Sequence, residues 1–329
     1  MRAAISVLGH HPFFVDKTGD LMPAALDAVL DPHLIGPGRL LALGETALRE
    51  ACLPLEALQT RSVSPLPVYL GLPEVRPGFT EMDAEAVGGG LARLKELPVM
   101  LGEVTCFLAG HAAGLSALSA AVRRLEQGAH DACLVGGVDS YCHPDTMEWL
   151  DANRQLVGSV SRSAFVPGEG AGFCLLMTEE ARARLSLRSA ASLRATAAGY
   201  ETHLLKSSEM SFGQGLTATI RDAVQGLRLP GEKVNQVICD INGERYRGEE
   251  WGFVCLRLSE YFDDPTAYLS PAECWGDVGA ASGPLFAMLA CQAVARGYAR
   301  GPRTLLWASS EGGCRAAALL EAGGSARLG

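Results

Sequence analysis

The 329-residue sequence lacks the features that would assign it at once to a membrane, secreted or nucleic-acid-binding class. No apolar run reaches the length of a membrane span. The N-terminus, MRAAISVLGHH, has neither the long apolar stretch nor the cleavage site of a signal peptide. Basic residues are outnumbered by acidic ones, for a net charge of −9, which argues against nucleic acid or an anionic membrane surface as the main partner. We expect a cytoplasmic protein.

Paired cysteines are also missing. The ten cysteines include no C-x-x-C pair, and most stand singly inside apolar runs. This pattern is typical of reduced, buried thiols and argues against a disulfide framework or a zinc site. Histidines His10, His11, His33 and His203 could be drawn as metal ligands, but their spacing fixes no geometry. We expect them in solvent-exposed loops, with no metal and no cofactor.

What the sequence does contain is a large apolar fraction, 48 %, with only 20 % charged residues, which predicts a globular chain with a large core. Apolar runs at strand and helix spacing alternate along it. The expected helices are 22–30, 39–58, 81–97, 112–127, 143–153, 179–184, 216–227, 249–261 and 285–295. The expected strands are 3–8, 63–72, 103–108, 132–135, 171–177, 193–200, 234–241, 267–269, 304–309 and 315–320.

The stretch from Glu103 to Ser140 organises this pattern. An apolar strand, Glu103–Leu108, leads into a small-residue turn, and His111 stands where the turn becomes a helix. A second buried strand follows and closes on Gly136-Gly137. A residue at the start of a helix faces unpaired N–H groups and the positive end of the helix dipole, which suits a nucleophile or an anion.

The second half of the chain repeats this plan. Gly279-Ala-Ala-Ser-Gly feeds another alanine-rich helix, which is followed by an apolar strand and by Gly312-Gly313. The two turn-and-helix units indicate an internal repeat of roughly 150 residues, each a β/α unit. Helices this rich in alanine and glycine are expected to lie buried between sheets.

Four stretches, in this order, resemble the β-ketoacyl synthases: the turn and helix at 109–127, the strand Cys133–Asp139, the turn Pro167–Phe173, and Gly276–Gly283 with its helix. With Gly312-Gly313 they span roughly residues 100–320, while the first hundred residues match poorly. The resemblance implies an α/β fold, the thiolase-like five-layered α-β-α-β-α sandwich built from two duplicated halves. We expect the halves to be residues 1–185 and 186–329.

The resemblance also implies a Cys-His-His catalytic set, and this chain departs from it. Where the family has its cysteine nucleophile the sequence has His111, and the two histidines become Asn242 and Asp277. Further family positions, a lysine, a glutamate and an aromatic gate, are replaced by Ala272, Phe286 and Glu311. The structural glycines remain while the chemical positions differ, a pattern that indicates a retained fold with a lost or replaced activity.

Two functions follow from this pattern. The first is a subunit that does not catalyse condensation, forming a homodimer or a heterodimer with a ketosynthase-like chain in an acyl or polyketide system, as chain-length factors do. The second is a re-purposed acyltransferase or thioester hydrolase in which Asp277 orients His111 as a base. A cluster at His111, Asn242 and Asp277 could thus be inert, catalytic, or a pocket for an acyl or small polar ligand.

The strand 103–108 indicates how the chain would assemble with a partner. The strand 103–108 would be aggregation-prone as an open edge, so we expect a dimer through it. Cys106 on that strand is expected to be an inert buried thiol, and Glu169 is expected to shape the turn that leads into the strand 171–177.

An acidic loop (Asp240, Glu244, Glu249 and Glu250) is expected to face solvent, where it would repel an acyl carrier protein. A basic cluster (Arg182, Arg184, Arg188 and Arg194) could receive such a carrier or be a solvated helix face.

Overall fold

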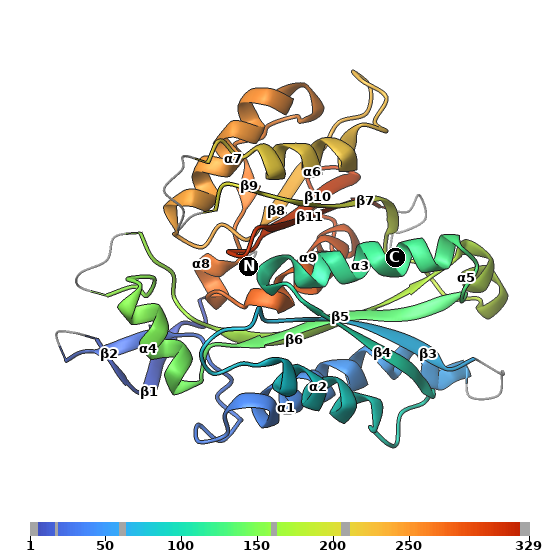
Figure 1. The fold of residues 1–329 in the computed structure, drawn as a ribbon. Coiled ribbons are helices and arrows are strands. Elements are labelled where there is room, and N and C mark those ends of the chain that lie inside the picture. The colour runs from blue at the N-terminus through green and yellow to red at the C-terminus, as the bar shows by residue number, and fades with distance from the viewer. Residues whose placement is uncertain (1–5, 17–18, 59–63, 159–162, 205–210, 323–329) are drawn as a thin grey trace.

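The structure is a computed structural model that describes residues 6–16, 19–58, 64–158, 163–204 and 211–322. Two β-sheets lie between layers of helices, so that the order through the molecule is helices, sheet, helices, sheet, helices (Figure 1). This arrangement is the α-β-α-β-α sandwich that the resemblance implies.

The first sheet contains four strands in the order β4-β3-β5-β6. Strands β3 (Leu66–Leu72), β4 (Leu101–Leu108) and β5 (Ala132–Ser140) run parallel, and β6 (Glu169–Met177) runs antiparallel to β5. Strand β4 therefore forms one edge of this sheet within the described residues.

The second sheet contains five strands in the order β7-β11-β10-β8-β9. Its members are β7 (Ser192–Tyr200), β8 (Gln236–Cys239), β9 (Tyr268–Leu269), β10 (Arg303–Ser309) and β11 (Cys314–Glu321). Strands β9-β8-β10-β11 have the same order and directions as β4-β3-β5-β6, which is the internal duplication seen at the level of strands. Strand β7, which runs antiparallel to β11, has no counterpart in the first sheet.

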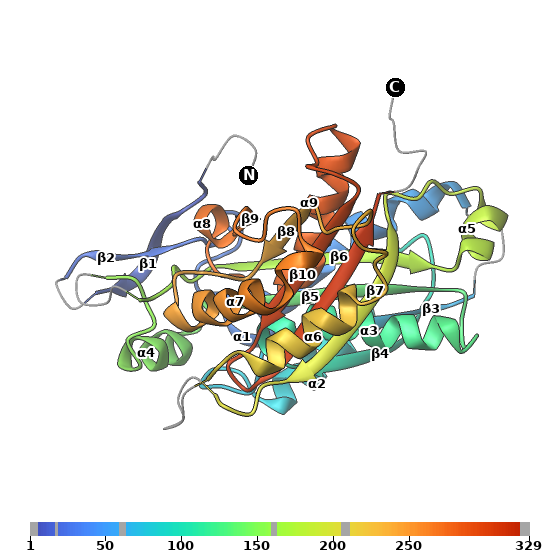
Figure 2. The same ribbon diagram turned by 90° about the horizontal axis from the view of Figure 1, so that it is seen from above.

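Helices cover both sheets on both faces. The outer layers are α1 (Gly36–Cys52) with α2 (Glu81–Ala92) on the first sheet and α6 (Gln214–Val224) with α7 (Arg245–Leu258) on the second (Figures 1 and 2). Between the sheets lie α3 (Ala113–Glu126) and α9 (Ser282–Ala295). Short helices α4 (Pro144–Ala152), α5 (Glu179–Leu185) and α8 (Ala272–Trp275) lie in the connections, and β1 (Gly9–Val15) and β2 (Leu21–Ala24) form a separate hairpin.

The two central helices pack closely because small residues line their contact. A Cβ on Gly114 of α3 would collide with the ring of Pro284 at the start of α9, and one on Gly283 would lie within 3.1 Å of three atoms of Leu115. Larger side chains would push the helices apart and open the core, since interiors are packed to crystal density. This contact confirms the expectation that one such helix from each half lies between the sheets.

Each central helix is entered through the same local backbone. A one-turn 3₁₀ segment precedes each helix, Gly110–Ala112 before α3 and Gly279–Ala281 before α9. Their first residues, Gly110 and Gly279, have φ of 55° and 46°. This left-handed conformation favours glycine, which explains why both turns carry one there.

The N-terminal elements differ from expectation. The helix predicted over 22–30 is wrong, because Leu21–Ala24 pairs with Gly9–Val15 as a strand. Part of the predicted strand 3–8 lies outside the described residues, and residues 6–8 are not in a strand. Burial alternates along β2 as expected of a strand, so Met22 and Ala24 are buried while Leu21 is half exposed.

Two helix starts also differ. Helix α6 begins at Gln214 rather than at Leu216, and the Thr217 hydroxyl donates to the Gly213 carbonyl inside its first turn. Helix α7 begins at Arg245 rather than at Glu249. Within the described residues, no helix has the length and apolar character that crossing a bilayer requires.

Candidate active site

His111 lies in the turn between β4 and α3, at the centre of the molecule. The turn Gly110–Ala112 holds it at the N-terminal end of the buried helix, and its side chain is almost entirely enclosed, with 8 % of the residue exposed. The turn can approach the loop after β3 because Gly110 has no Cβ, which would lie 3.2 Å from the Glu74 side chain.

The second half of the chain supplies the groups that contact His111. Asp277, which precedes the turn into α9, places its carboxylate oxygens 2.9 and 2.8 Å from His111 Nε2. Asn242, just after β8, donates its amide N–H to Asp277 Oδ2. The three residues singled out in the sequence therefore meet in one cluster, assembled from both halves.

Asp277 is the acceptor at the centre of this cluster. It also accepts from the Tyr141 hydroxyl at 3.3 Å and from the Gly279 backbone N–H at 2.8 Å. Burial alone would raise the pKa of Asp277, but His111, Arg247 and Asn242 together hold it far below its ordinary value. The carboxylate is thus ionised at neutral pH.

Sequence reasoning missed Arg247, a fully buried cation on α7 beside His111. Its guanidinium donates to the carboxylates of Asp240 and Glu244, the latter at 3.1 Å, and to the Ser309 carbonyl. One of its terminal nitrogens lies 3.3 Å from His111 Nδ1 and 3.2 Å from Nε2. The only signal in the sequence is an arginine standing between acidic residues.

The acidic loop is largely buried, which corrects the expectation that it faces solvent. Asp240, Glu244 and Glu250 are at most 5 % exposed, and only Glu249 lies on the surface, paired with Arg245. Arg247 neutralises the first two and Arg315 pairs with Glu250 at 2.5 Å. Buried charges persist where such partners exist.

The pKa of His111 reflects opposite influences. Burial and the nearby Arg247 guanidinium lower it, but the Asp277 carboxylate raises it further, so that the net pKa lies above the ordinary value. We favour this direction because Arg247 is already neutralised by its own carboxylates, whereas Asp277 contacts the ring directly. His111 and Asp277 therefore form an ion pair.

The backbone donors at the start of α3 are also occupied. The Ala112 N–H donates to the Ser310 hydroxyl at 2.8 Å, and this hydroxyl donates to the Ala109 carbonyl at 2.5 Å. Ser310 comes from the turn between β10 and β11. A donor that would otherwise be available to an oxyanion at a helix N-terminus is thus bound by a side chain.

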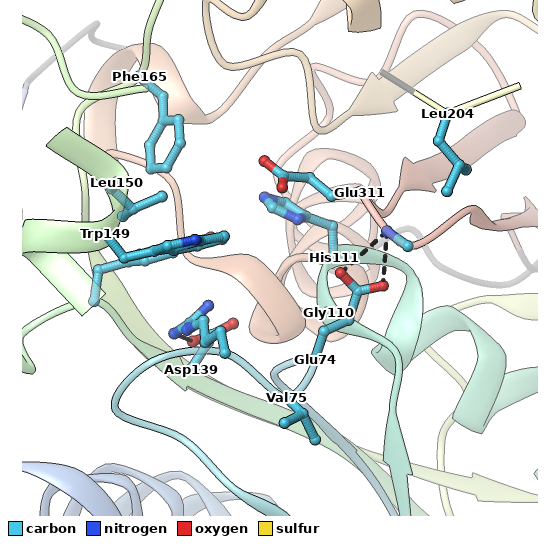
Figure 3. A pocket seen from close by; sticks show the side chains of 13 residues that line it. Glu74, Val75, Gly110, His111, Asp139, Trp149, Leu150, Phe165, Leu204 and Glu311 are labelled. Carbon is cyan, nitrogen blue, oxygen red and sulfur yellow. Dashed lines mark hydrogen bonds and ion pairs between the residues drawn. The ribbon is translucent and has the colours of Figure 1, made fainter. Parts of the chain in front are cut away.

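A cavity of about 410 Å³ opens beside His111. Figure 3 shows Trp149 on one side of it and Glu74 on the other, with His111 and Glu311 between them. Its lining comes from both halves: Glu74, Val75, Arg76, Gly110, His111, Asp139, Tyr141, Trp149, Leu150, Phe165, Leu204, Glu311 and Gly312.

Residues 99–182 match the family model of the β-ketoacyl synthase N-terminal domain. The ketosynthase from module 6 of the bacillaene synthase of Bacillus subtilis 168 has a TM-score of 0.76 at 14 % identity, over 98 % of this chain and 68 % of that one. An oxazolomycin ketosynthase domain from Streptomyces albus JA3453 has a TM-score of 0.72 at 16 % identity, over 98 % and 70 %. The family model thus matches the middle of the chain, and the fold of the chain is that of these ketosynthases.

A third solved structure, of a type II polyketide synthase acyl-carrier protein in complex with its ketosynthase bound to the hexaketide, has a TM-score of 0.73 at 15 % identity. It is matched over 97 % of this chain and 92 % of that one. At such identities the likeness to solved structures concerns the fold alone. A search of curated protein sequences gives no match.

The other positions that the resemblance singles out do not join the cluster. Ala272 begins the short helix α8, and Phe286 is buried in α9 within the core between the sheets. Glu311 does line the cavity, where it accepts a hydrogen bond from Gln155. Glu169 has the structural role expected of it, since it is buried against Arg39 and accepts from the Ser140 hydroxyl at 2.7 Å.

The remaining candidate residues lie outside this cluster. Among the residues placed by the structure, no group of three or more His, Cys, Asp or Glu side chains could hold a metal ion. His11 is 5 % exposed, not solvent-exposed as expected, because its Nδ1 accepts backbone N–H groups of its own strand. Arg182, Arg184 and Arg194 are each paired with a carboxylate.

Proposed function

We propose that this protein is a ketosynthase-fold subunit that does not catalyse condensation and acts in an acyl or polyketide-type system. The observation that carries the proposal is His111, ion-paired to Asp277 and contacted by Arg247, at the position where the resemblance places the cysteine nucleophile. An imidazole held in this way cannot take up an acyl chain as a thiolate does.

The thiols support the same conclusion. Cys106 is the nearest to His111 in the sequence, but it lies on β4, where its Sγ is 4.0 Å from the Ala84 carbonyl. Burial raises the pKa of Cys106 above its ordinary value, and it raises that of Cys133 to about 12. Because thiolate is the reactive form, these side chains are poor nucleophiles at neutral pH.

The second candidate is an acyltransferase or thioester hydrolase with His111 as its base. The 2.8 Å contact between Asp277 and His111 favours it, since such a pair orients catalytic imidazoles. Two observations weigh against it. Asp277 and Arg247 contact both ring nitrogens, and the raised pKa of His111 favours the protonated imidazole, which has no lone pair to accept a proton.

The partner we propose is a second copy or a ketosynthase-like chain that adds to the edge strand β4. An acyl carrier protein is a further candidate, because one of the similar ketosynthases is complexed with such a carrier. The pairing of the arginines near α5 with carboxylates weakens the case for that surface as the carrier's docking site.

Covalent labelling and an assay of thioester turnover together test this proposal. Wild type, His111→Ala and Asp277→Asn are incubated at pH 7 with acyl thioesters or iodoacetamide and analysed by intact mass spectrometry. We expect no acyl adduct, no turnover and only slow alkylation. His111→Cys is the positive control, because a thiol at the start of α3 should be labelled faster than any native cysteine. Turnover by the wild type that both variants abolish would instead establish the hydrolase.

A further inference from the structure

The cavity beside His111 contains a cation whose hydrogen bonds are incomplete. The side chain of Arg76 is 9 % exposed and lines the cavity. Its terminal nitrogen Nη2 donates to Asp139 at 2.6 Å and to the Ser140 carbonyl at 3.0 Å, and the guanidinium lies 4.4 Å from the centre of the Tyr141 ring. Its Nε is buried without a hydrogen-bond partner in the described part of the chain. A buried donor left in this state is costly, so it indicates a missing acceptor.

The same loop after β3 also places a carboxylate in the lining, and this carboxylate has no ion pair within the described residues. Glu74 accepts from the Gly312 backbone N–H, at 3.1 and 3.2 Å to its two oxygens. No basic side chain of the residues that the structure describes lies within ion-pair distance of it. A Cβ at Gly312 would displace the Glu74 carboxylate from this position. Burial raises the pKa of Glu74 above its ordinary value, and the Gly312 N–H and the nearby His111 and Arg247 only partly oppose this.

The rest of this lining is largely aromatic and apolar. Trp149 lies across the cavity from Glu74, and Phe165, Leu150 and Val75 also line it (Figure 3). A carboxylate on one side favours an ammonium group, and an aromatic face on the other favours apolar substituents. The cavity thus offers a donor, an acceptor and an apolar surface to one small ligand.

We propose that this cavity binds an α-aminoacyl group, with its ammonium at Glu74, its carbonyl or carboxylate oxygen at Arg76 and its side chain against Trp149. The proposal rests on the proposed function in one respect, that His111 does not react with the ligand. A simple acyl group would leave Glu74 facing apolar atoms. A simple carboxylate would meet Glu74 and Glu311 without a compensating positive charge of its own.

The oxygen at Arg76 could belong to a free amino acid or to an aminoacyl group tethered to a carrier. Four probes separate these sources by calorimetric titration: L-phenylalanine, L-phenylalaninamide, 3-phenylpropanoate and 3-phenylpropanamide. We expect each amino compound to bind at least tenfold more tightly than its deamino counterpart. Tighter binding of phenylalanine points to a free amino acid, and tighter binding of the amide points to a tethered aminoacyl group.

Substitutions test which side chains contact the ligand. Glu74→Gln should remove the tenfold preference for the amino compounds, whereas Glu85→Gln, an exposed carboxylate on α2, should leave it intact. Arg76→Lys should weaken amino and deamino probes equally. Equal binding of amino and deamino probes by the wild type, or binding of none of them, would overturn the inference. Neither result touches the proposed function, which fails only if a covalent acyl adduct or thioester turnover is found.

Discussion

At the scale of single residues, the charge of His111 depends on two neighbours of opposite sign. Asp277 holds a proton on the ring, and Arg247 opposes it from the other side. Arg247 is in turn neutralised by Asp240 and Glu244, so the cluster is balanced only as a whole. The positive end of the helix would stabilise a thiolate at this position. It opposes a protonated imidazole, so the charge of His111 depends on the surrounding carboxylates.

The raised pKa of His111 predicts a pH dependence of stability. In the unfolded chain the imidazole loses its proton near its ordinary pKa of 6.5, whereas in the folded chain it keeps the proton to higher pH. Between these values the folded state binds more protons, so its stability must fall as the pH rises. Urea unfolding from pH 6 to 9 should show this fall, and His111→Gln should flatten it. Parallel curves for the two proteins would contradict the assignment.

Arg247 should contribute strongly to stability. Replacement by Met leaves Asp240 and Glu244 buried without their cation, which typically costs about 3–5 kcal/mol. Denaturant unfolding of Arg247→Met measures this loss. Arg245→Met, two residues away and exposed, serves as the control and should change the free energy of unfolding very little. Equal effects of the two substitutions would show that the buried network is unimportant.

Sequence reasoning located part of this site. The motifs brought out His111, Asn242 and Asp277 because their neighbouring glycines fix the turns on which they lie. They could not bring out Arg247, and they placed Asp240 and Glu244 in solvent. A charged residue in a loop is ordinarily exposed, and its burial can be inferred only when its partner is known to pack against it.

At the scale of elements, periodicity predicted the strands and helices of both sheets well, because each has one face or both faces in the core. It failed where burial is weaker. The hairpin of β1 and β2 has half-exposed residues such as Phe13, Val15 and Leu21, so its alternation was hidden among apolar residues. Helix α6 is preceded by Gly213, which carries no capping side chain, so no N-cap signal in the sequence marks its start.

The contact between the central helices gives a prediction at this scale. Gly114→Ala adds a methyl group against Pro284 and the Ala280 carbonyl, and such overpacking costs about 1–3 kcal/mol. Gly248→Ala on the exposed side of α7 meets no atom within 4 Å and should stabilise by about 0.5–1 kcal/mol, as alanine does in helices. Thermal unfolding compares the two, and destabilisation by both or by neither would contradict this account of the packing.

At the scale of the whole molecule, β4 is an open edge of the first sheet within the described residues. Glu103 and Thr105 are its exposed residues, while Val104 and Cys106 pack on the core. An unprotected edge of this kind is usually paired with another chain. The same feature was expected from the sequence, and the division into halves at residues 185 and 186 likewise stays a prediction.

We therefore expect a dimer of the chain, or a heterodimer when a ketosynthase-like partner is present. Light scattering coupled to size exclusion should give twice the monomer mass at micromolar concentration. Thr105→Lys brings two like charges together across the edge and should give monomers, while Ser189→Lys in an exposed loop should not. A wild-type protein that is monomeric at this concentration would contradict the proposed dimer.

The paired turns before α3 and α9 match in backbone but not in side chain. Gly110 corresponds to Gly279, so His111 corresponds to Ala280. The pair of His111 with Asp277 therefore takes its histidine from one turn and its carboxylate from the approach to the other. Exchanging the two turns would separate the imidazole from its carboxylate, so the two halves are not interchangeable at this site.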